Sequence, residues 1–175
     1  MRHRFHPLVT CAFAALVVTL NAQSVTRESV PGITNFARVE KTIACAGAIT
    51  PVAVGELKVR GYASIINLRE ASEPGADIDA EAAAAKVSGI NFIHIPFNGV
   101  TLSPALVDRF LSAVVSPANQ PVFVHDATAN RAAAMWMIKR IKVDNWEADR
   151  AATEATALGL TSTALRSFAL QYAQK

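Results

Sequence analysis

The sequence predicts a single α/β domain with a mostly parallel central sheet and helices on both faces of that sheet. Short apolar runs of strand length alternate along the chain with segments of helical periodicity. Strands separated by helices of this length imply crossover connections, and sheets built in that way are covered on both faces. The chain is 51% hydrophobic and 18% charged, which suits one domain with a substantial core. No internal repeat or low-complexity linker indicates a second domain.

The predicted strands are short, apolar and rich in β-branched or aromatic residues. Their lengths are those of strands buried on both faces. In chain order they are residues 36–46, which form one or two strands, and residues 62–68, 92–95 and 122–125.

The predicted helices begin and end at recognisable signals. Thr50 and Ser103 are N-cap candidates, and each is followed by a proline at the first helical position. Gly61 and Gly89 are placed to end the first and second helices. The predicted helices cover residues 51–60, 79–88, 104–114, 132–141, 146–158 and 161–172.

The first residues have the pattern of a secretory signal rather than of a folded segment. Arg2 and Arg4 supply positive charge, and an uncharged apolar run follows from Leu8 to Leu20. A membrane-spanning helix needs about 20 apolar residues, so this run favours a cleaved signal over an anchor. We expect a signal peptide at residues 1–22, an extended N-terminal arm at 23–35 and one folded domain at 36–175. The expected location is periplasmic or secreted, with no membrane attachment after cleavage.

Charge and cysteine content exclude several function classes. Lys and Arg number 17 against 14 Asp and Glu, and without Arg2 and Arg4 the count falls to 15 against 14. With no basic cluster, nucleic acid is not an expected partner. Cys45 alone remains after processing, so no internal disulfide forms, and we expect a small buried side chain. His94 and His125 are too few for a zinc site, and neither a metal nor another cofactor is predicted.

One segment contains the residues of a candidate binding or catalytic site. The strand that ends at His125 leads into a tight loop of Asp126, Ala127, Thr128, Ala129 and Asn130, and Arg131 opens an apolar helix. In open α/β sheets, ligands bind beyond the carboxyl ends of the strands. Unpaired N–H groups at a helix start and an arginine fork favour an anion such as phosphate. The alternative is an ordinary strand-to-helix turn with Arg131 in a surface ion pair.

The same segment resembles a known family. His125 directly precedes Asp126, and Arg131 follows Asp126 by five residues, which resembles the His-Cys-any-five-Arg signature of protein tyrosine and dual-specificity phosphatases. The nearer likeness is to the bacterial phosphatase-like domain related to that of beta-lactamase-hydrolase-like proteins, in which a strand, His-Cys, small polar residues, Asn-Arg and an apolar helix follow one another. The matching segments, within residues 36–172, are VFVH, NRAAAMWMI, YASIINLRE, AAKVSGINFIHIPF, EATALGL and TALRSFALQYA.

The resemblance implies catalysis by a cysteine thiolate that attacks phosphorus, with the arginine and loop N–H groups holding the phosphoryl oxygens. In this chain Asp126 stands at the cysteine's position. We expect its carboxylate to accept the loop N–H groups and to pair with Arg131, as a built-in anion, while His125 braces the loop. An aspartyl-phosphate mechanism remains a second possibility, although it normally needs magnesium and no metal set is evident.

The resemblance also implies a general acid from a neighbouring loop. The loop at residues 96–103 contains no carboxylate, and Asp108 has the pattern of a solvated helix residue that pairs with a neighbour. Glu70 and Glu73 follow the second predicted strand and are the remaining candidates near the pocket.

The function predicted from these observations is an exported tyrosine or dual-specificity phosphatase-like protein without ordinary cysteine-phosphatase activity. In this interpretation the loop at residues 126–131 can still bind an anion such as phosphate, and a phosphate-containing ligand or phosphoprotein is a possible partner. Two alternatives stay open, an active phosphate-ester hydrolase that uses Asp126 and a non-catalytic interaction module. The oligomeric state is not predicted.

Overall fold

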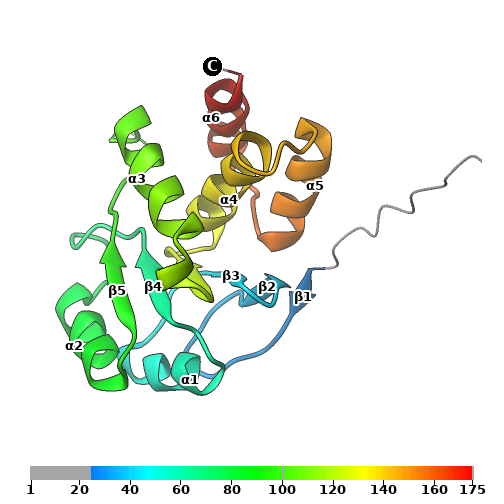
Figure 1. Cartoon of the computed structure of the whole chain (residues 1–175). Coiled ribbons are helices and arrows are strands. Elements are labelled where there is room, and N and C mark those ends of the chain that lie inside the picture. Colours follow the sequence, from blue (N-terminus) through cyan, green and yellow to red (C-terminus); the bar gives the residue numbers. More distant parts are fainter. Residues whose placement is uncertain (1–24, 100, 175) are drawn as a thin grey trace, which may run out of the picture.

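The computed structural model describes residues 25–99 and 101–174. The predicted signal peptide, residues 1–22, lies outside the described residues. The described strands form one sheet in the order β1-β2-β3-β6-β4-β5 (Figure 1). The strands are β1 (Thr26–Arg27), β2 (Ala37–Glu40), β3 (Ile43–Ala46), β4 (Ser64–Asn67), β5 (Asn91–His94) and β6 (Val122–His125).

The strands β3, β6, β4 and β5 run parallel, whereas β1 and β2 pair antiparallel at one edge. The predicted mostly parallel sheet is therefore confirmed. The predicted segment 36–46 forms the two strands β2 and β3, which a tight turn connects. Because parallel neighbours share one direction, the carboxyl ends of β3, β6 and β4 lie together at one edge.

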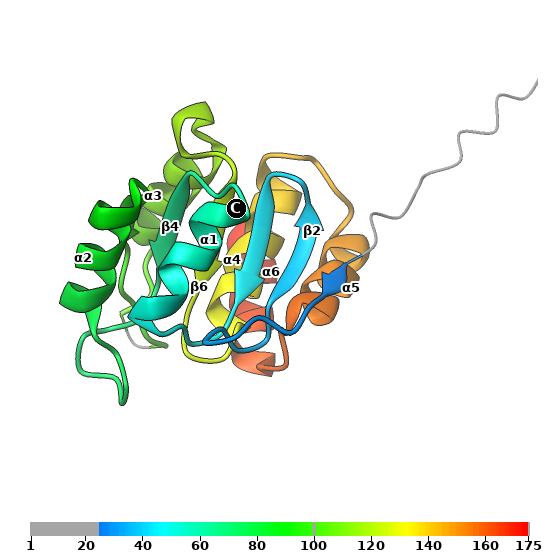
Figure 2. The same ribbon diagram turned by 90° about the horizontal axis from the view of Figure 1, so that it is seen from below.

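Helices cover both faces of the sheet, as predicted. Two helices, α1 and α2, lie on one face, and α3, α4, α5 and α6 form the layer on the other (Figures 1 and 2). Their bounds are α1 (Val54–Val59), α2 (Ile78–Ser88), α3 (Pro104–Val115), α4 (Asn130–Lys142), α5 (Ala148–Leu158) and α6 (Thr163–Ala173). Single 3-10 turns precede α1 and follow α3, at η1 (Pro51–Ala53) and η2 (Pro117–Asn119).

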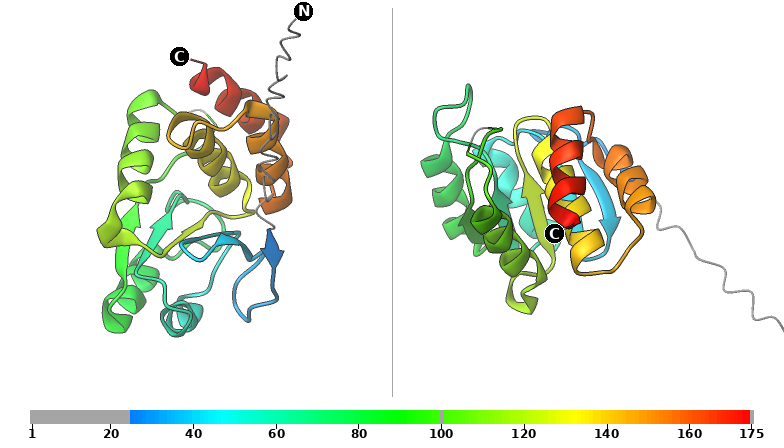
Figure 3. Two further views of the ribbon diagram at one scale, coloured as in Figure 1. Left: turned by 45° about the vertical axis from the view of Figure 1, so that its right-hand side comes forward. Right: turned by 90° about the horizontal axis from the view of Figure 1, so that it is seen from above.

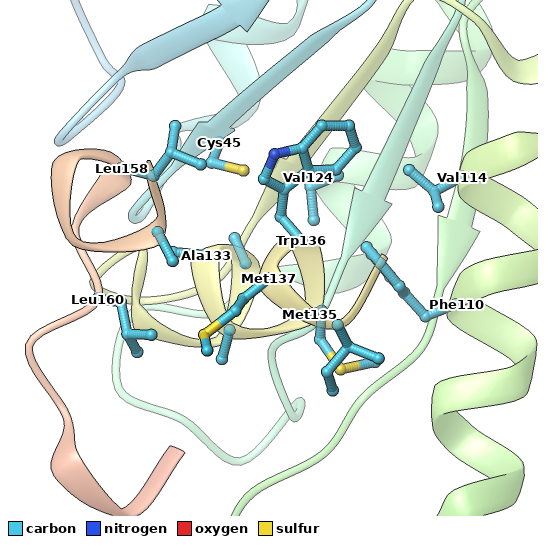
Figure 4. Packing of buried hydrophobic residues seen from close by; sticks show 14 of the residues in the cluster. Cys45, Phe110, Val114, Val124, Ala133, Met135, Trp136, Met137, Leu158 and Leu160 are labelled. Carbon is cyan, nitrogen blue, oxygen red and sulfur yellow. The ribbon is translucent and has the colours of Figure 1, made fainter. Parts of the chain in front are cut away.

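Helix α4 lies at the centre of the larger core, between the sheet and the neighbouring helices. Its residues Ala133, Met135 and Met137 are buried, with Phe110 of α3 and Leu158 of α5 in the same cluster (Figure 4). A helix buried on nearly all sides has no need of a polar face. This explains why residues 132–138 are all apolar, and it fixes the start of α4 against the sheet.

Both N-cap predictions are confirmed in position, since Thr50 and Ser103 are the N-cap residues of η1 and α3. Thr50 and Ser103 do precede helical turns that start with proline, but neither side chain makes a capping hydrogen bond. The backbone carbonyl of Ser103 accepts from the N–H groups of Leu106 and Val107, and the carbonyl of Thr50 accepts from Ala53. Both residues therefore cap their helices through the backbone alone.

The N-terminal segment packs on the domain from Val25 onward. Strand β1 pairs with β2, and the side chains of Val30 and Ile33 are buried in the smaller core on the α1 side. Arg27 also donates a hydrogen bond to the carbonyl oxygen of Ala157, near the end of α5. Within the described part of the chain, no helix is long and apolar enough to cross a membrane.

Candidate anion loop and adjoining pocket

The loop that follows β6 lies at the carboxyl edge of the sheet, where the topology places ligands in open α/β folds. The backbone after β3 holds it from one side. Gly47 forms a bridge with Thr128, and the N–H of Ala48 donates to the carbonyl of Ala127 at 3.2 Å. Asn35 adds a side-chain hydrogen bond to the carbonyl of Thr128 at 3.3 Å. The loop is thus positioned by two segments that are distant in sequence.

The loop turns into α4 through a left-handed residue. Ala129 is fully buried and has φ 79° and ψ −5°, a conformation in which non-glycine residues are strained. This conformation lets successive N–H groups point to one side, as in the backbone nests that bind anions. Gly159, at the end of α5, leaves room for the Ala129 methyl group, because a Cβ at Gly159 would lie 3.1 Å from it.

The Asp126 carboxylate occupies this nest. Its Oδ1 accepts hydrogen bonds from the N–H groups of Thr128 at 2.6 Å and Ala129 at 3.0 Å, and Oδ2 accepts from Ala132 at 2.8 Å. The side chain is 1% exposed. The expectation that Asp126 takes up the loop N–H groups agrees with this geometry, which places a negative charge at the start of α4.

The expected pairing of Arg131 with Asp126 was wrong. Arg131 instead forms a bidentate ion pair with Glu73, with Nη1–Oε1 at 2.6 Å and Nη2–Oε2 at 2.8 Å. Nη1 also donates to the carbonyl oxygen of Phe97. The reason is that backbone N–H groups already satisfy both Asp126 oxygens, while Glu73 offers a planar carboxylate that matches the guanidinium fork. The alternative drawn from the sequence was an ion pair of Arg131 at the surface, whereas the Arg131 and Glu73 side chains are only 13% and 19% exposed.

Glu70 and Glu73 do approach the pocket, as the sequence suggested. Burial acts to raise the pKa of Glu73, but hydrogen bonds from Arg131 and from the backbone N–H of Glu70 outweigh it and hold the pKa below its ordinary value. Glu70 points elsewhere, and both of its oxygens accept from Nδ2 of Asn98 at 2.8 Å. The two carboxylates therefore have different partners, one a cation and the other a neutral amide.

A pocket of about 460 Å³ opens beside the loop, between the loops at the sheet edge and helix α6. Its polar side contains Glu70, Glu73 and Arg131, and its apolar side comes mainly from α6. Asp126 is not among its lining residues. The residues that line it are Glu70, Glu73, Asn98, Gly99, Leu102, Thr128, Asn130, Arg131, Ser162, Ala164, Leu165 and Phe168.

His125 is bound away from the loop. Its Nε2 donates to Oε1 of Glu81 on α2 at 2.8 Å, and Asn67 of β4 donates to the other oxygen of Glu81 at 2.9 Å. All three side chains are buried. The expectation that His125 braces the loop directly was therefore wrong, because its hydrogen bond ties β6 to α2. Sequence reasoning missed Glu81 and Asn67, since neither lies near the loop in the chain.

Residues 35–143, well over half of the chain, match the family described as the phosphatase-like domain of beta-lactamase hydrolase-like protein. The chain belongs to this family. The resemblance inferred from the sequence is confirmed. A beta-lactamase hydrolase-like protein of Xylella fastidiosa strain Temecula1 is 34% identical over 86 residues, which are 47% of this chain and 19% of that protein. The match thus spans about a fifth of the length of this relative.

Solved structures of phosphatases share the fold. The core catalytic domain of the PP-IP phosphatase Siw14 from S. cerevisiae, in complex with citrate, has a TM-score of 0.69 at 22% identity, over 82% of this chain and 88% of that one. TpbA of P. aeruginosa has a TM-score of 0.67 at 18% identity, over 89% and 92% of the two chains. At these identities the likeness establishes the fold alone.

The phosphatase-like loop of this chain is shorter than the general phosphatase signature. Four residues separate Asp126 from Arg131, whereas the signature compared above has five between its Cys and Arg. The comparison drawn from the sequence overlooked this difference. In the structure Asn130 begins α4, and its Oδ1 accepts from the backbone N–H groups of Thr161 at 2.7 Å and Ser162 at 2.8 Å. Asn130 thus joins the loop to the start of α6.

The other candidate side chains of this phosphatase-like domain have structural partners. Nε2 of His94 is hydrogen-bonded to the carbonyl of Arg69 at 2.8 Å, as expected for a satisfied histidine. Asp108 accepts from the Tyr172 hydroxyl at 2.7 Å. Burial, and next the charge of Asp126, raise the pKa of the Cys45 thiol, so it stays protonated. Within residues 25–99 and 101–174, no group of three or more His, Cys, Asp or Glu side chains is placed to hold a metal ion.

Proposed function

We propose that this protein has the phosphatase fold without cysteine-phosphatase activity, and that Asp126 stands at the nucleophile position as an internal anion. The observation that carries the proposal is the set of three backbone N–H groups bound by the Asp126 carboxylate. A phosphate ester would need these same donors, and it would meet a negative charge at contact distance. The loop therefore keeps its anion-binding shape with the anion already supplied by the chain.

The geometry disfavours Asp126 as a covalent nucleophile. A carboxylate attacks phosphorus with an accessible oxygen, but Asp126 is 1% exposed and backbone N–H groups bind both of its oxygens. Arg131, which would hold phosphoryl oxygens, is bound by Glu73 and by the carbonyl of Phe97. An active mechanism would require both interactions to break before a phosphate could bind. We therefore place the protein among binding proteins.

Hydrolysis of p-nitrophenyl phosphate by purified wild type and by the Asp126→Cys variant tests this proposal, with and without magnesium. We expect background rates for the wild type and a measurable gain for Asp126→Cys, because a thiolate restores the missing nucleophile; removal of a nucleophile typically costs at least about a thousandfold. The double variant Asp126→Cys/Arg131→Ala should lose the gain. Thermal unfolding of each variant shows whether it is folded.

Two results would contradict the proposal. Metal-free hydrolysis by the wild type that disappears in Arg131→Ala would show that Asp126 supports chemistry. Inactivity of a folded Asp126→Cys variant would show that the missing cysteine is not the reason for the lack of phosphatase activity. The likeness to phosphatases would then be limited to the fold.

Export is a separate part of the proposal, supported by the charged start and the apolar run from Leu8 to Leu20. Expression of the full chain in a bacterial host, followed by fractionation and N-terminal sequencing, tests it. We expect a periplasmic protein that begins near Gln23, and an uncleaved protein in the cytoplasm would refute it.

A further inference from the structure

The pocket beside the loop has the wrong charge for phosphate. Among its lining side chains, Glu70 and Glu73 carry negative charge and Arg131 alone carries positive charge. The Arg131 guanidinium is committed to Glu73 and to the carbonyl of Phe97. Outside the lining, the buried Asp126 adds one negative charge, and Arg69, which lies 3.4 Å from Glu73, adds one positive charge. The local field therefore favours a cation over an anion.

Glu70 is the lining carboxylate without a cationic partner. Its two oxygens accept from the neutral amide of Asn98, and among the described residues no Lys, Arg or His nitrogen lies within ion-pair distance of it. Glu70 is half-buried, so water screens its charge less than it screens that of a fully exposed carboxylate. A bound cation would supply the positive charge beside Glu70 that the described residues do not provide.

The opposite side of the same pocket is apolar. Helix α6 contributes Ala164, Leu165 and Phe168, and Leu102 adds a further aliphatic side chain. Figure 3 shows α6 lying along α4, so this wall is part of the packed helical layer. A volume of about 460 Å³ is within the range of small-molecule sites. The pocket therefore combines one unpaired carboxylate with an apolar surface large enough for an aromatic ring.

We propose that this pocket binds a small organic cation, with an ammonium or guanidinium group against Glu70 and an apolar body against Leu165 and Phe168. This inference rests on the proposed function, because a working phosphatase would need Arg131 free for phosphoryl oxygens. Because Arg131 is paired with Glu73, its guanidinium does not compete with the ligand for Glu70. The positive group of the ligand can therefore bind Glu70 directly. An anion of the same shape would meet both carboxylates.

Calorimetric and NMR titrations of the mature chain with matched probes test the inference. The probes are 2-phenylethylamine, its anionic counterpart 3-phenylpropionate, and inorganic phosphate. We expect the amine to bind at least about tenfold more tightly than either anion, with shifts at Leu165 and Phe168. Glu70→Gln should weaken amine binding by about tenfold or more, whereas Glu147→Gln, an exposed glutamate at the start of α5, should leave it unchanged.

With these probes, three outcomes would overturn the inference. They are equal or tighter binding of an anion, amine binding that survives in Glu70→Gln, and no amine binding up to about 10 mM. A capped Leu-Lys-Leu peptide presents the same ammonium on a protein ligand, and tighter binding of this peptide than of the amine would exclude a small molecule. Hydrolysis is read in a separate assay. Wild-type turnover would refute the proposed function, whereas loss of amine binding without turnover would refute this inference alone.

Discussion

Three backbone N–H groups and the start of α4 converge on the Asp126 carboxylate. Each of these groups favours a negative charge, and a thiolate or a bound phosphate would satisfy the same donors. A carboxylate has two oxygens, and here Oδ1 binds two of the donors while Oδ2 binds the third. Ala129 stays in its left-handed conformation around this internal anion. Asp126 can therefore preserve the loop while removing the free donors on which phosphate binding depends.

The Glu73 carboxylate makes the stability of the site depend on pH. Its pKa in the folded protein lies below the ordinary glutamate value, since hydrogen bonds from Arg131 and the backbone outweigh the opposing effect of burial. A lowered pKa gives stability that is present above the unfolded-state pKa and is lost as pH falls through the folded-state value. We expect the wild-type unfolding free energy to decrease as pH falls below about 4.5. In Glu73→Gln this part of the decrease should be absent.

Urea unfolding between about pH 3 and 6 measures this difference. Glu147→Gln is the matched control, because Glu147 is exposed at the start of α5 and its side chain caps nothing. It should retain the wild-type slope. Identical pH dependence in Glu73→Gln and the wild type would show that the ion pair with Arg131 contributes nothing to stability.

Helices and strands were largely predictable because each has a local signal. The alanine-rich segment at residues 79–88 forms most of α2, and Gly89 ends it in the left-handed conformation. The N-cap at Thr50 was predictable from the Thr-Pro pair, but the sequence did not show that its side chain would make no capping hydrogen bond. The tight turn at η1 brings the Thr50 carbonyl to the N–H of Ala53.

Two glycines should respond in opposite directions to alanine. A Cβ at Gly47 would lie 2.4 Å from Oγ1 of Thr34 and 3.1 Å from the carbonyl oxygen of Ala127, so Gly47→Ala must displace the loop or the turn that supports it. We expect a loss of about 1–3 kcal/mol in unfolding free energy. Gly55 lies in α1 with open space around it, and Gly55→Ala should stabilise by about 0.5–1 kcal/mol.

Chemical denaturation measures both glycine variants, and amide chemical shifts locate the change. The shifts in Gly47→Ala should be largest at Ala127 and Thr128, whereas those in Gly55→Ala should stay within α1. A Gly47→Ala protein with wild-type stability and unshifted loop amides would mean that this close approach does not hold the loop.

The site as a whole was only partly predictable, because its side-chain contacts join distant segments. Arg131 and Glu73 are 58 positions apart, and His125 and Glu81 are 44 apart. The strand order brings the loops after β4 and β6 to one edge, which made Glu70 and Glu73 candidates. Which carboxylate meets Arg131 depends on side-chain geometry across that edge, and no local pattern encodes it.

The N-terminal segment links the stability of the fold to the geometry of the loop. Val30 and Ile33 are 3% and 7% exposed, and Asn35 donates to the carbonyl of Thr128. A chain that begins at Phe36 should therefore be less stable than one that begins at Gln23. Burial of an aliphatic side chain contributes about 1.5–3 kcal/mol, so the two lost side chains alone predict about 3–6 kcal/mol.

Urea unfolding of the two chains measures this loss, and hydrogen exchange of the Thr128 and Ala129 amides reports on the loop. We expect faster exchange in the shorter chain, since the loop loses the Asn35 hydrogen bond. The full-length variant Asn35→Ala separates the two effects, because it should speed exchange in the loop while Val30 and Ile33 still stabilise the core. Equal unfolding free energies, within about 0.5 kcal/mol, would show that the segment covers the sheet without stabilising it. Such a result would leave the loop supported by the backbone after β3 and by the hydrogen bonds of Asn130 to Thr161 and Ser162.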